Sequence, residues 1–97
     1  MRLDRYLFFV RLLKSRTLAQ ALIESGNVRV DGKRVAKPAE EVRVGSTLSF
    51  AMRGRVRIVR ILCLPERRGP ASEARACYKE MHEASDAENV SQQGGGN

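Results

Sequence analysis

Nine lysine and arginine side chains fall within the first 37 residues, and these are the groups with which this chain could do chemistry. The chemistry they offer is anion binding, because a guanidinium group meets a phosphate in planar, bidentate geometry and also stacks on bases. Arginine accounts for 14 of the 18 basic residues, which a charge needed only for solubility would not require. We predict a phosphate-binding surface that comprises Arg2, Arg5, Arg11, Lys14, Arg16, Arg29, Lys33, Arg34 and Lys37.

The charge is unevenly distributed along the 97 residues. Residues 1–68 carry 16 basic and 6 acidic side chains, a net charge of +10, whereas residues 69–97 carry 2 and 5, a net charge of −3. Together these give the formal net charge of +7. A basic body with an acidic end favours a polyanionic partner, nucleic acid before an anionic membrane.

A first short helix is expected near the N-terminus. Apolar residues recur from Leu3 at the spacing i, i+3, i+4 and i+7, which predicts a helix that ends at Leu12 or Leu13. Tyr6 lies on this stripe, so we expect it in the core. Asp4 falls in the first turn, where a negative charge suits the helix dipole.

A second helix is expected to follow after a sharp corner. Ser15 is a typical N-cap for a helix over residues 16–25, and Gly26 is a typical stop. The start of a helix presents free backbone N–H groups and the positive end of its dipole. Lys14 and Arg16 beside such a start would therefore form a phosphate site.

The stretch NVRVDGKRV predicts a tight hairpin with Asp31-Gly32 as a type I′ turn. This register pairs Val28 with Val35 and Val30 with Lys33. It also places Arg29 opposite Arg34, although like charges directly across a ladder destabilise each other. Either this is an ordinary solvated face, or an anion lies between the two arginines. In the second case the hairpin and the helix start would form one L-shaped positive groove.

The remainder of the first 64 residues is expected to complete a small sheet. Val42 and Val44 alternate with polar residues, as do Leu48 and Phe50, and the stretch VRIVRILCL is typical of a long strand. The predicted fold class is therefore α+β, with two short helices packed on a mainly antiparallel sheet of four or five strands. The basic residues of the later strands, which are Arg53, Arg55, Arg57 and Arg60, either bind the partner or form a solvated face.

The sequence changes in character after Pro65. Ala74, Cys77, Tyr78 and Met81 fall at helical spacing and predict a C-terminal helix that could dock on the body. The polar, glycine-ended stretch that follows is typical of a disordered tail. We therefore divide the chain into a domain at 1–64, a helical extension at 65–83 and a tail at 84–97.

Several spaced motifs in the first half of the chain resemble a known family. They are RLDR, KSRTLAQ, GNVRVDG, KP and VRVGST, and they all lie within the stretch from residue 2 to residue 50. This pattern resembles the S4-type RNA-binding domain, the module named after the fourth protein of the small ribosomal subunit. The resemblance implies an RNA surface at the second helix start and the hairpin. We expect Lys14→Glu or Arg16→Glu to weaken RNA binding and to leave the fold intact, because neither residue lies on the buried stripe.

A second, narrower resemblance lies in the stretch RRGPASEARACYKE, residues 67–80. It is similar to the bacterial fifteen-kilodalton heat-shock protein family of stand-alone S4-type proteins. That resemblance implies binding to ribosomal RNA or the large ribosomal subunit, with a role at stalled subunits that still carry a nascent chain. The basic C-terminal extension of that family is replaced here by a short acidic tail.

The sequence carries no signal for catalysis, a metal or a cofactor. It has no acid pair in an apolar setting, no nucleophile beside a base, and no glycine-rich phosphate loop after a strand. Cys63 and Cys77 lack metal-site spacing and are expected to be reduced thiols. With no apolar run long enough to span a bilayer and no signal peptide, we expect a cytoplasmic protein that does not bind membranes or small-molecule substrates and is a monomer.

Two other functions remain open from the residues alone. The chain could be an RNA-binding accessory module of an RNA-modifying enzyme, such as a pseudouridine synthase or a methyltransferase. It could also be a DNA-binding helix-turn-helix regulator with RTLAQALIES as its recognition helix, but the exposed face of that helix offers mainly Gln20 and Glu24, which suit base reading poorly.

Overall fold

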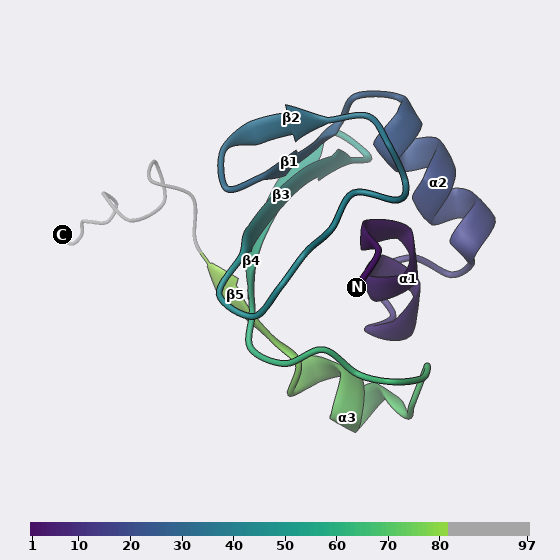
Figure 1. The fold of residues 1–97 in the computed structure, drawn as a ribbon, viewed down its shortest axis with the longest axis vertical. Helices are drawn as coiled ribbons and strands as arrows, with labels where there is room; N and C mark the ends of the chain where they lie inside the picture. Colours follow the sequence, from purple (N-terminus) through teal and green to yellow (C-terminus); the bar gives the residue numbers. More distant parts are fainter. Residues whose placement is uncertain (82–97) are drawn as a thin grey trace, which may run out of the picture.

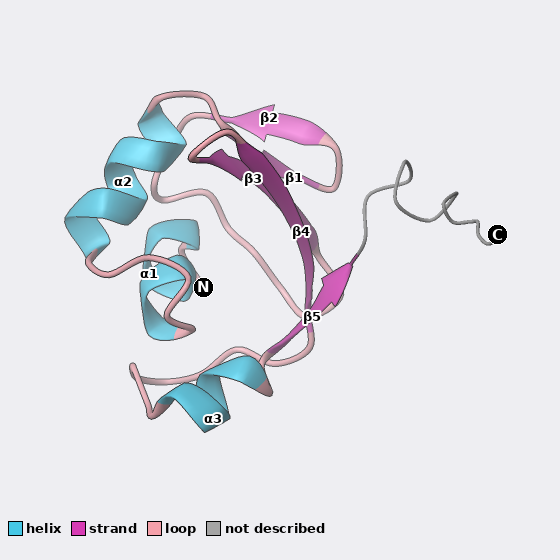
Figure 2. Ribbon diagram, turned by 180° about the vertical axis from the view of Figure 1, so that it is seen from behind, coloured by secondary structure: helices cyan, strands magenta, loops and turns pink. Residues whose placement is uncertain are grey.

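The computed structural model describes residues 1–81 and confirms the α+β fold class. Helices α1 (Leu3–Phe9) and α2 (Arg16–Glu24) precede strands β1 (Val28–Val30), β2 (Lys33–Val35), β3 (Thr47–Met52) and β4 (Arg55–Ile61). Helix α3 (Ala71–Arg75) and strand β5 (Tyr78–Met81) follow. Within residues 1–81, helices α1, α2 and α3 lie on one side of the sheet, and no helix lies on its other face (Figures 1 and 2).

The sheet is entirely antiparallel, with strand order β2-β1-β3-β4-β5. The hairpin register is the predicted one, and it sets Arg29 opposite Arg34. Because side chains alternate between faces, this register decides which residues point toward the helices. We call the helix-covered side the inner face and the bare side the outer face.

Helix α1 is shorter than the sequence predicts. It ends at Phe9, and Arg11 adopts a left-handed backbone conformation with φ of 62°. Leu12 and Leu13 are nevertheless buried, because the chain doubles back and returns both side chains to the core. The prediction that the helix continues to Leu12 or Leu13 is therefore wrong, although both residues belong to the core.

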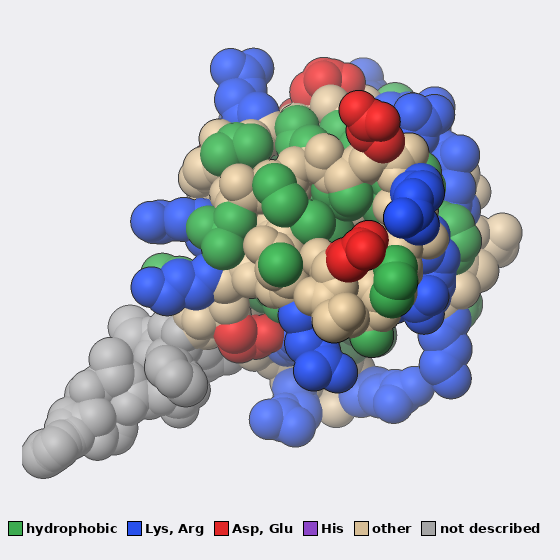
Figure 3. All heavy atoms as spheres, turned by 90° about the horizontal axis from the view of Figure 1, so that it is seen from below, with side chains coloured by type: hydrophobic (Ala, Val, Ile, Leu, Met, Phe, Trp, Pro, Cys, Tyr) green, Lys and Arg blue, Asp and Glu red, His purple; other side chains and the backbone are tan. Residues whose placement is uncertain are grey.

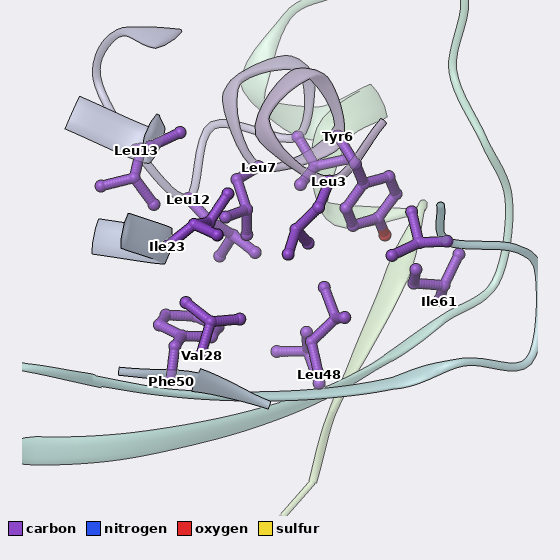
Figure 4. Close-up of a cluster of buried hydrophobic side chains, with 14 of the residues drawn as sticks. Leu3, Tyr6, Leu7, Leu12, Leu13, Ile23, Val28, Leu48, Phe50 and Ile61 are labelled. Carbon is purple, nitrogen blue, oxygen red and sulfur yellow. The ribbon is translucent and has the colours of Figure 1, made fainter. Parts of the chain in front are cut away.

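Helix α2 begins as predicted, because Ser15 caps it: the Leu18 N–H donates to Ser15 Oγ at 3.1 Å. Its buried residues Ala19 and Ile23 face the sheet. Figure 4 shows side chains of α1 and α2 meeting Val28, Leu48 and Phe50 from the strands. This layer of apolar contacts fixes α1 and α2 on the inner face.

Tyr6 belongs to the core, as predicted, and is fully buried. Its hydroxyl donates to the Cys77 carbonyl oxygen at 3.0 Å, so the polar tip has a partner. This bond ties α1 to a residue 71 positions later in the chain. The C-terminal segment is thereby part of the same core.

The predicted C-terminal helix is only partly correct. Helix α3 ends at Arg75, and the residues that follow pair with β4 as strand β5, with Tyr78 opposite Ile61. Over so short a run, the apolar pattern of a helix cannot be distinguished from that of a strand. The edge of β4 offers free backbone hydrogen-bonding groups, and β5 pairs with them. The predicted tail at 84–97 lies outside the described residues.

The predicted strand around Val42 and Val44 does not form. Val42 is buried outside any strand, and its N–H donates to the Met1 carbonyl oxygen at 2.9 Å.

Within residues 1–81, no helix has the length and apolar character to cross a membrane. The same residues bring together no group of three or more potential metal ligands.

Candidate nucleic-acid interface

One buried carboxylate organises the basic residues at the start of α1 and α2. Asp4 has no exposed surface, and it accepts hydrogen bonds from two arginines that are 14 residues apart in the chain. Arg2 donates through Nε and Nη2, each at 3.1 Å, and Arg16 donates through Nη2 at 3.1 Å. Gln20 Nε2 at 3.0 Å and the Arg5 backbone N–H at 2.7 Å complete the set. Asp4 is therefore an anchor for the basic groups, a role that the sequence did not indicate.

The environment of Asp4 holds it in its charged form. Burial by itself raises the pKa of this carboxyl group, but the hydrogen bonds from Gln20, Arg2, Arg16 and the Arg5 backbone outweigh it and lower the pKa to about 2. Asp4 is thus ionised at neutral pH. It offsets part of the repulsion between the two guanidinium groups, which still expose 42% and 38% of their side chains.

The exposed parts of these groups form a basic surface with two neighbours. Arg5 and Lys14 are exposed, and neither has an ion-pair partner among the described residues. Lys14 directly precedes Ser15, so it lies beside the free N–H groups at the start of α2. We call Arg2, Arg5, Lys14 and Arg16 the helix-start surface. An anionic oxygen there would meet fixed guanidinium groups as well as a helix dipole.

Arg16 is more than a binding residue, because it is tied to a buried charge. A glutamate at position 16 would bring a second carboxylate against Asp4. The expectation that Arg16→Glu leaves the fold intact therefore does not hold for this structure. For Lys14, which makes no ion pair in the described part of the chain, it stays a prediction.

Arg11 differs from the other predicted residues. Its Nε donates to the Gly69 carbonyl oxygen at 2.7 Å, and nearby the guanidinium of Arg68 lies 4.5 Å from the centre of the Phe8 ring. These contacts join the end of α1 to the segment before α3. Arg11 is exposed, but its main visible role is to hold that segment.

The predicted hairpin residues do not all share one groove with the helix start. Arg29 and Arg34 point to the outer face, away from the helices, whereas Lys33 pairs with Val30 on the inner side. Lys33 lines a hollow of about 430 Å³ that is also lined by three acidic residues, Asp31, Glu40 and Glu41. Lys37 is exposed in the loop after β2. The L-shaped positive groove is therefore replaced by basic groups on two faces.

The arginines of the later strands also separate into two groups. Arg57 is bound to Glu80 on β5 through Nε at 3.2 Å and Nη2 at 2.6 Å, and this bond raises the Arg57 pKa. Arg60 lies on the outer face and has no ion-pair partner within residues 1–81. In Figure 3, Lys and Arg side chains line the edge of the molecule on the helix side, and others project from the opposite edge.

Comparison with known proteins identifies the domain that carries the helix-start surface. The family description "S4 domain" matches residues 1–48, which span α1, α2 and the hairpin. The chain is an S4-domain protein. The match ends within β3, so the last two strands and α3 lie beyond it.

Curated relatives extend the similarity of this S4-domain protein toward its C-terminal half. Heat shock protein 15 of Escherichia coli K12 is 39% identical over 83 residues, which is 86% of this chain and 62% of that protein. Small ribosomal subunit protein uS4 of Lactobacillus delbrueckii is 43% identical over 49 residues, 50% of this chain and 24% of that protein. The chain thus spans less than two thirds of the length of either relative.

A solved structure supports the same family for this S4-domain protein. Heat shock protein 15 of Vibrio cholerae, described as trimeric, superposes with a TM-score of 0.81 at 28% identity. The alignment covers 94% of this chain and 91% of that one. Because this coverage exceeds residues 1–48, the α3–β5 segment belongs to the shared fold and is not an unrelated addition.

Proposed function

We propose that this protein binds RNA through its helix-start surface, without catalysing a reaction. The observation that carries the proposal is the Asp4 anchor, which fixes Arg2 and Arg16 beside the capped start of α2. Fixed guanidinium groups lose less conformational freedom when they meet a phosphate than free ones do. The S4 domain match over the same residues supports RNA as the source of that phosphate.

We further propose that the RNA is ribosomal, and that it belongs to the large subunit. The similarity to heat shock protein 15 over 86% of the chain favours a ribosome-associated role in stress, and the match to uS4 favours ribosomal RNA in general. The structure adds a physical reason for preferring a structured RNA. The helix-start surface offers phosphate contacts and few groups that could read base edges, so it suits recognition of shape.

The structure argues against a DNA-binding helix-turn-helix role. In such a motif the side chains of the second helix read bases in the major groove. Here the amide of Gln20, the best candidate reader on α2, donates to Asp4 at 3.0 Å. Leu18, an apolar residue with 49% exposure, occupies the accessible side of the same helix. Neither group offers the pattern of donors and acceptors that DNA bases require.

The proposal is tested with Lys14→Gln, because Lys14 is exposed and makes no ion pair in the described part of the chain. Binding of ribosomal RNA is measured by fluorescence anisotropy between 50 and 300 mM salt, with Arg75→Gln on α3 as a control of equal charge. We expect Lys14→Gln to weaken binding several-fold and to reduce the slope of log affinity against log salt by about one. Equal effects of the two variants would show that only net charge matters and would exclude a defined surface.

The choice of subunit is tested by sedimentation of the protein with separated large and small ribosomal subunits. We expect it to sediment with the large subunit, and Lys14→Gln to reduce that fraction. Equal recovery with both subunits would leave general RNA binding in place and exclude the large-subunit proposal.

A further inference from the structure

The outer face of the sheet carries a charge pattern that neither the fold nor the helix-start surface explains. Strand register places ten described side chains on it, and none is acidic. They are Arg34 on β2, Arg29 on β1, Thr47, Ser49 and Ala51 on β3, Val56, Ile58 and Arg60 on β4, and Lys79 and Met81 on β5.

The four basic residues of this face form two like-charge pairs directly across neighbouring strands. Arg29 lies opposite Arg34 in the β1–β2 ladder, and Arg60 lies opposite Lys79 in the β4–β5 ladder. All four side chains are exposed. Like charges at directly opposed positions destabilise a sheet, so each pair reduces the stability of the free protein.

A basic residue on the inner face of the same sheet, by contrast, has an acidic partner. Arg57 on β4 lies near Glu80 on β5, and the two form a bidentate ion pair. No comparable partner exists for Arg60 or Lys79 within residues 1–81, although both come from the same two strands. In the described part of the chain, the lack of acids is thus particular to the outer face and not to this end of the sheet.

The two pairs are close enough for one extended ligand to contact both. Arg29 and Arg60 are two strands apart and offset by two residues, about 10 Å across the sheet and about 7 Å along it. On the outer face, Ser49 and Ile58 lie between Arg29 and Arg60. Ala51 and Val56, the latter 50% exposed, lie on the other side of the row formed by Arg29, Ser49 and Ile58, away from Arg60. A shallow hollow of about 160 Å³ at the hairpin end is lined by Arg29 together with Arg34, Ala51 and Val56.

We propose that the outer face is a second RNA-binding surface, on which a single-stranded segment runs from the hairpin pair to the Arg60–Lys79 pair. Phosphates would lie between the members of each pair and relieve their repulsion, while a ribose or base would cover Ile58 between the two pairs. This inference rests on the proposed function, because it assigns the occupant as RNA. It adds a site on the face opposite the helices, with Arg60 and Lys79 beyond the stretch that matches the S4 domain.

The test compares Arg60→Gln/Lys79→Gln with Arg67→Gln/Arg75→Gln, a control with the same charge that alters only residues around α3. The probe is a fluorescent 20-nucleotide single-stranded RNA, and the full chain is titrated between 50 and 300 mM salt. We expect the outer-face variant to lose at least about fivefold in affinity and about 1.4 in salt slope, while the control changes little. We also expect it to unfold at an equal or higher urea concentration than wild type, because a repulsive pair has been removed.

The outcomes separate this inference from the proposed function. If wild type does not bind RNA, both fail. If wild type binds and the outer-face variant binds equally well, or if the control loses as much, only the second surface is excluded. If the outer-face variant instead changes the sedimentation of the free protein, the face binds a second copy of the chain. If it changes only binding to anionic lipid vesicles, the face binds a membrane. Either result would also overturn the inference. Should the double variant fold poorly, Arg29→Gln/Arg34→Gln at the other end serves as the second test, with the same expected losses.

Discussion

Replacement of Asp4 by asparagine is expected to weaken both the fold and RNA binding, although it raises the net charge by one. Asparagine keeps the shape of the side chain but replaces one oxygen by an amide that donates hydrogen bonds. Three donors converge on Oδ2, from Arg2, Arg16 and Gln20, and two on Oδ1. In either orientation of the new amide, its NH2 group therefore faces hydrogen-bond donors and cannot accept a bond from them.

The magnitude follows from the pKa of Asp4. A folded-state pKa of about 2 against the ordinary value of 3.8 corresponds to about 2 kcal/mol in favour of the charged form. Because asparagine resembles the neutral carboxylic acid, we expect Asp4→Asn to lower the free energy of unfolding by about 2–3 kcal/mol. For a domain of this size, that corresponds to a fall in Tm of about 10–20 °C.

The pH dependence gives a sharper test than the single value. The folded-state pKa is depressed, so the stabilisation by Asp4 is complete above about pH 5 and is lost as the pH falls through about 2. The difference between wild type and Asp4→Asn in urea unfolding should therefore shrink from pH 7 toward pH 2. Glu24→Gln, which makes the same charge change at an exposed position on α2, should show no such trend. A difference that stays constant with pH, or a loss below about 0.5 kcal/mol at pH 7, would refute the anchor.

Three further predictions follow from other contacts. Arg16→Glu should lower the free energy of unfolding by about 2 kcal/mol or more, and Arg16→Gln should lower it by less, because only the glutamate adds a second carboxylate beside Asp4. Urea unfolding measures both losses, and equal losses would contradict this prediction. Tyr6→Phe should lower the free energy of unfolding by only about 1 kcal/mol, measured by thermal or urea unfolding. The Cys77 carbonyl oxygen loses the Tyr6 hydroxyl but still accepts hydrogen bonds from the backbone N–H groups of Leu62 and Cys63. A loss above about 3 kcal/mol would contradict the view that the hydroxyl contributes one ordinary hydrogen bond. A thiol reagent should label the exposed Cys63 in the native protein and should label Cys77 only on unfolding. Burial, and to a smaller extent the contact with Cys63, raises the Cys77 pKa to about 11, so its thiol is unreactive in the folded protein. Mass spectrometry follows the labelling, and equal rates at the two cysteines would contradict this prediction.

Local patterns in the sequence predicted those parts of the fold that local physics decides. The Ser15 cap, the Asp31-Gly32 turn and the register of the hairpin each depend on a few neighbouring residues, and all three are confirmed. The role of Asp4 depends on the way α1 crosses α2, which brings Arg16 and Gln20 to a carboxylate 12 and 16 positions away. No spacing rule within one helix could have shown that meeting. Strand β5 was missed for a similar reason, because its residues have helical spacing and become a strand only where β4 offers an open edge.

The distribution of acids indicates which of the many cations in this small domain have structural roles and which are available for binding. Asp4 balances two arginines at the helix start, and Glu80 balances Arg57 on the inner face. Each of these acids is placed where a cation would otherwise disturb the packing of α1 and α2 or the β4–β5 ladder. Among residues 1–81 the outer face has no such acid, yet strand register sets its four cations in directly opposed pairs, an arrangement that destabilises the free protein. A sequence under pressure for stability alone would need only one glutamate at position 60 or 79 to remove one of these repulsions. The structure therefore distinguishes a balanced, anchored surface at the helix start from an unbalanced one on the sheet, and a bound polyanion would stabilise the second more than the first.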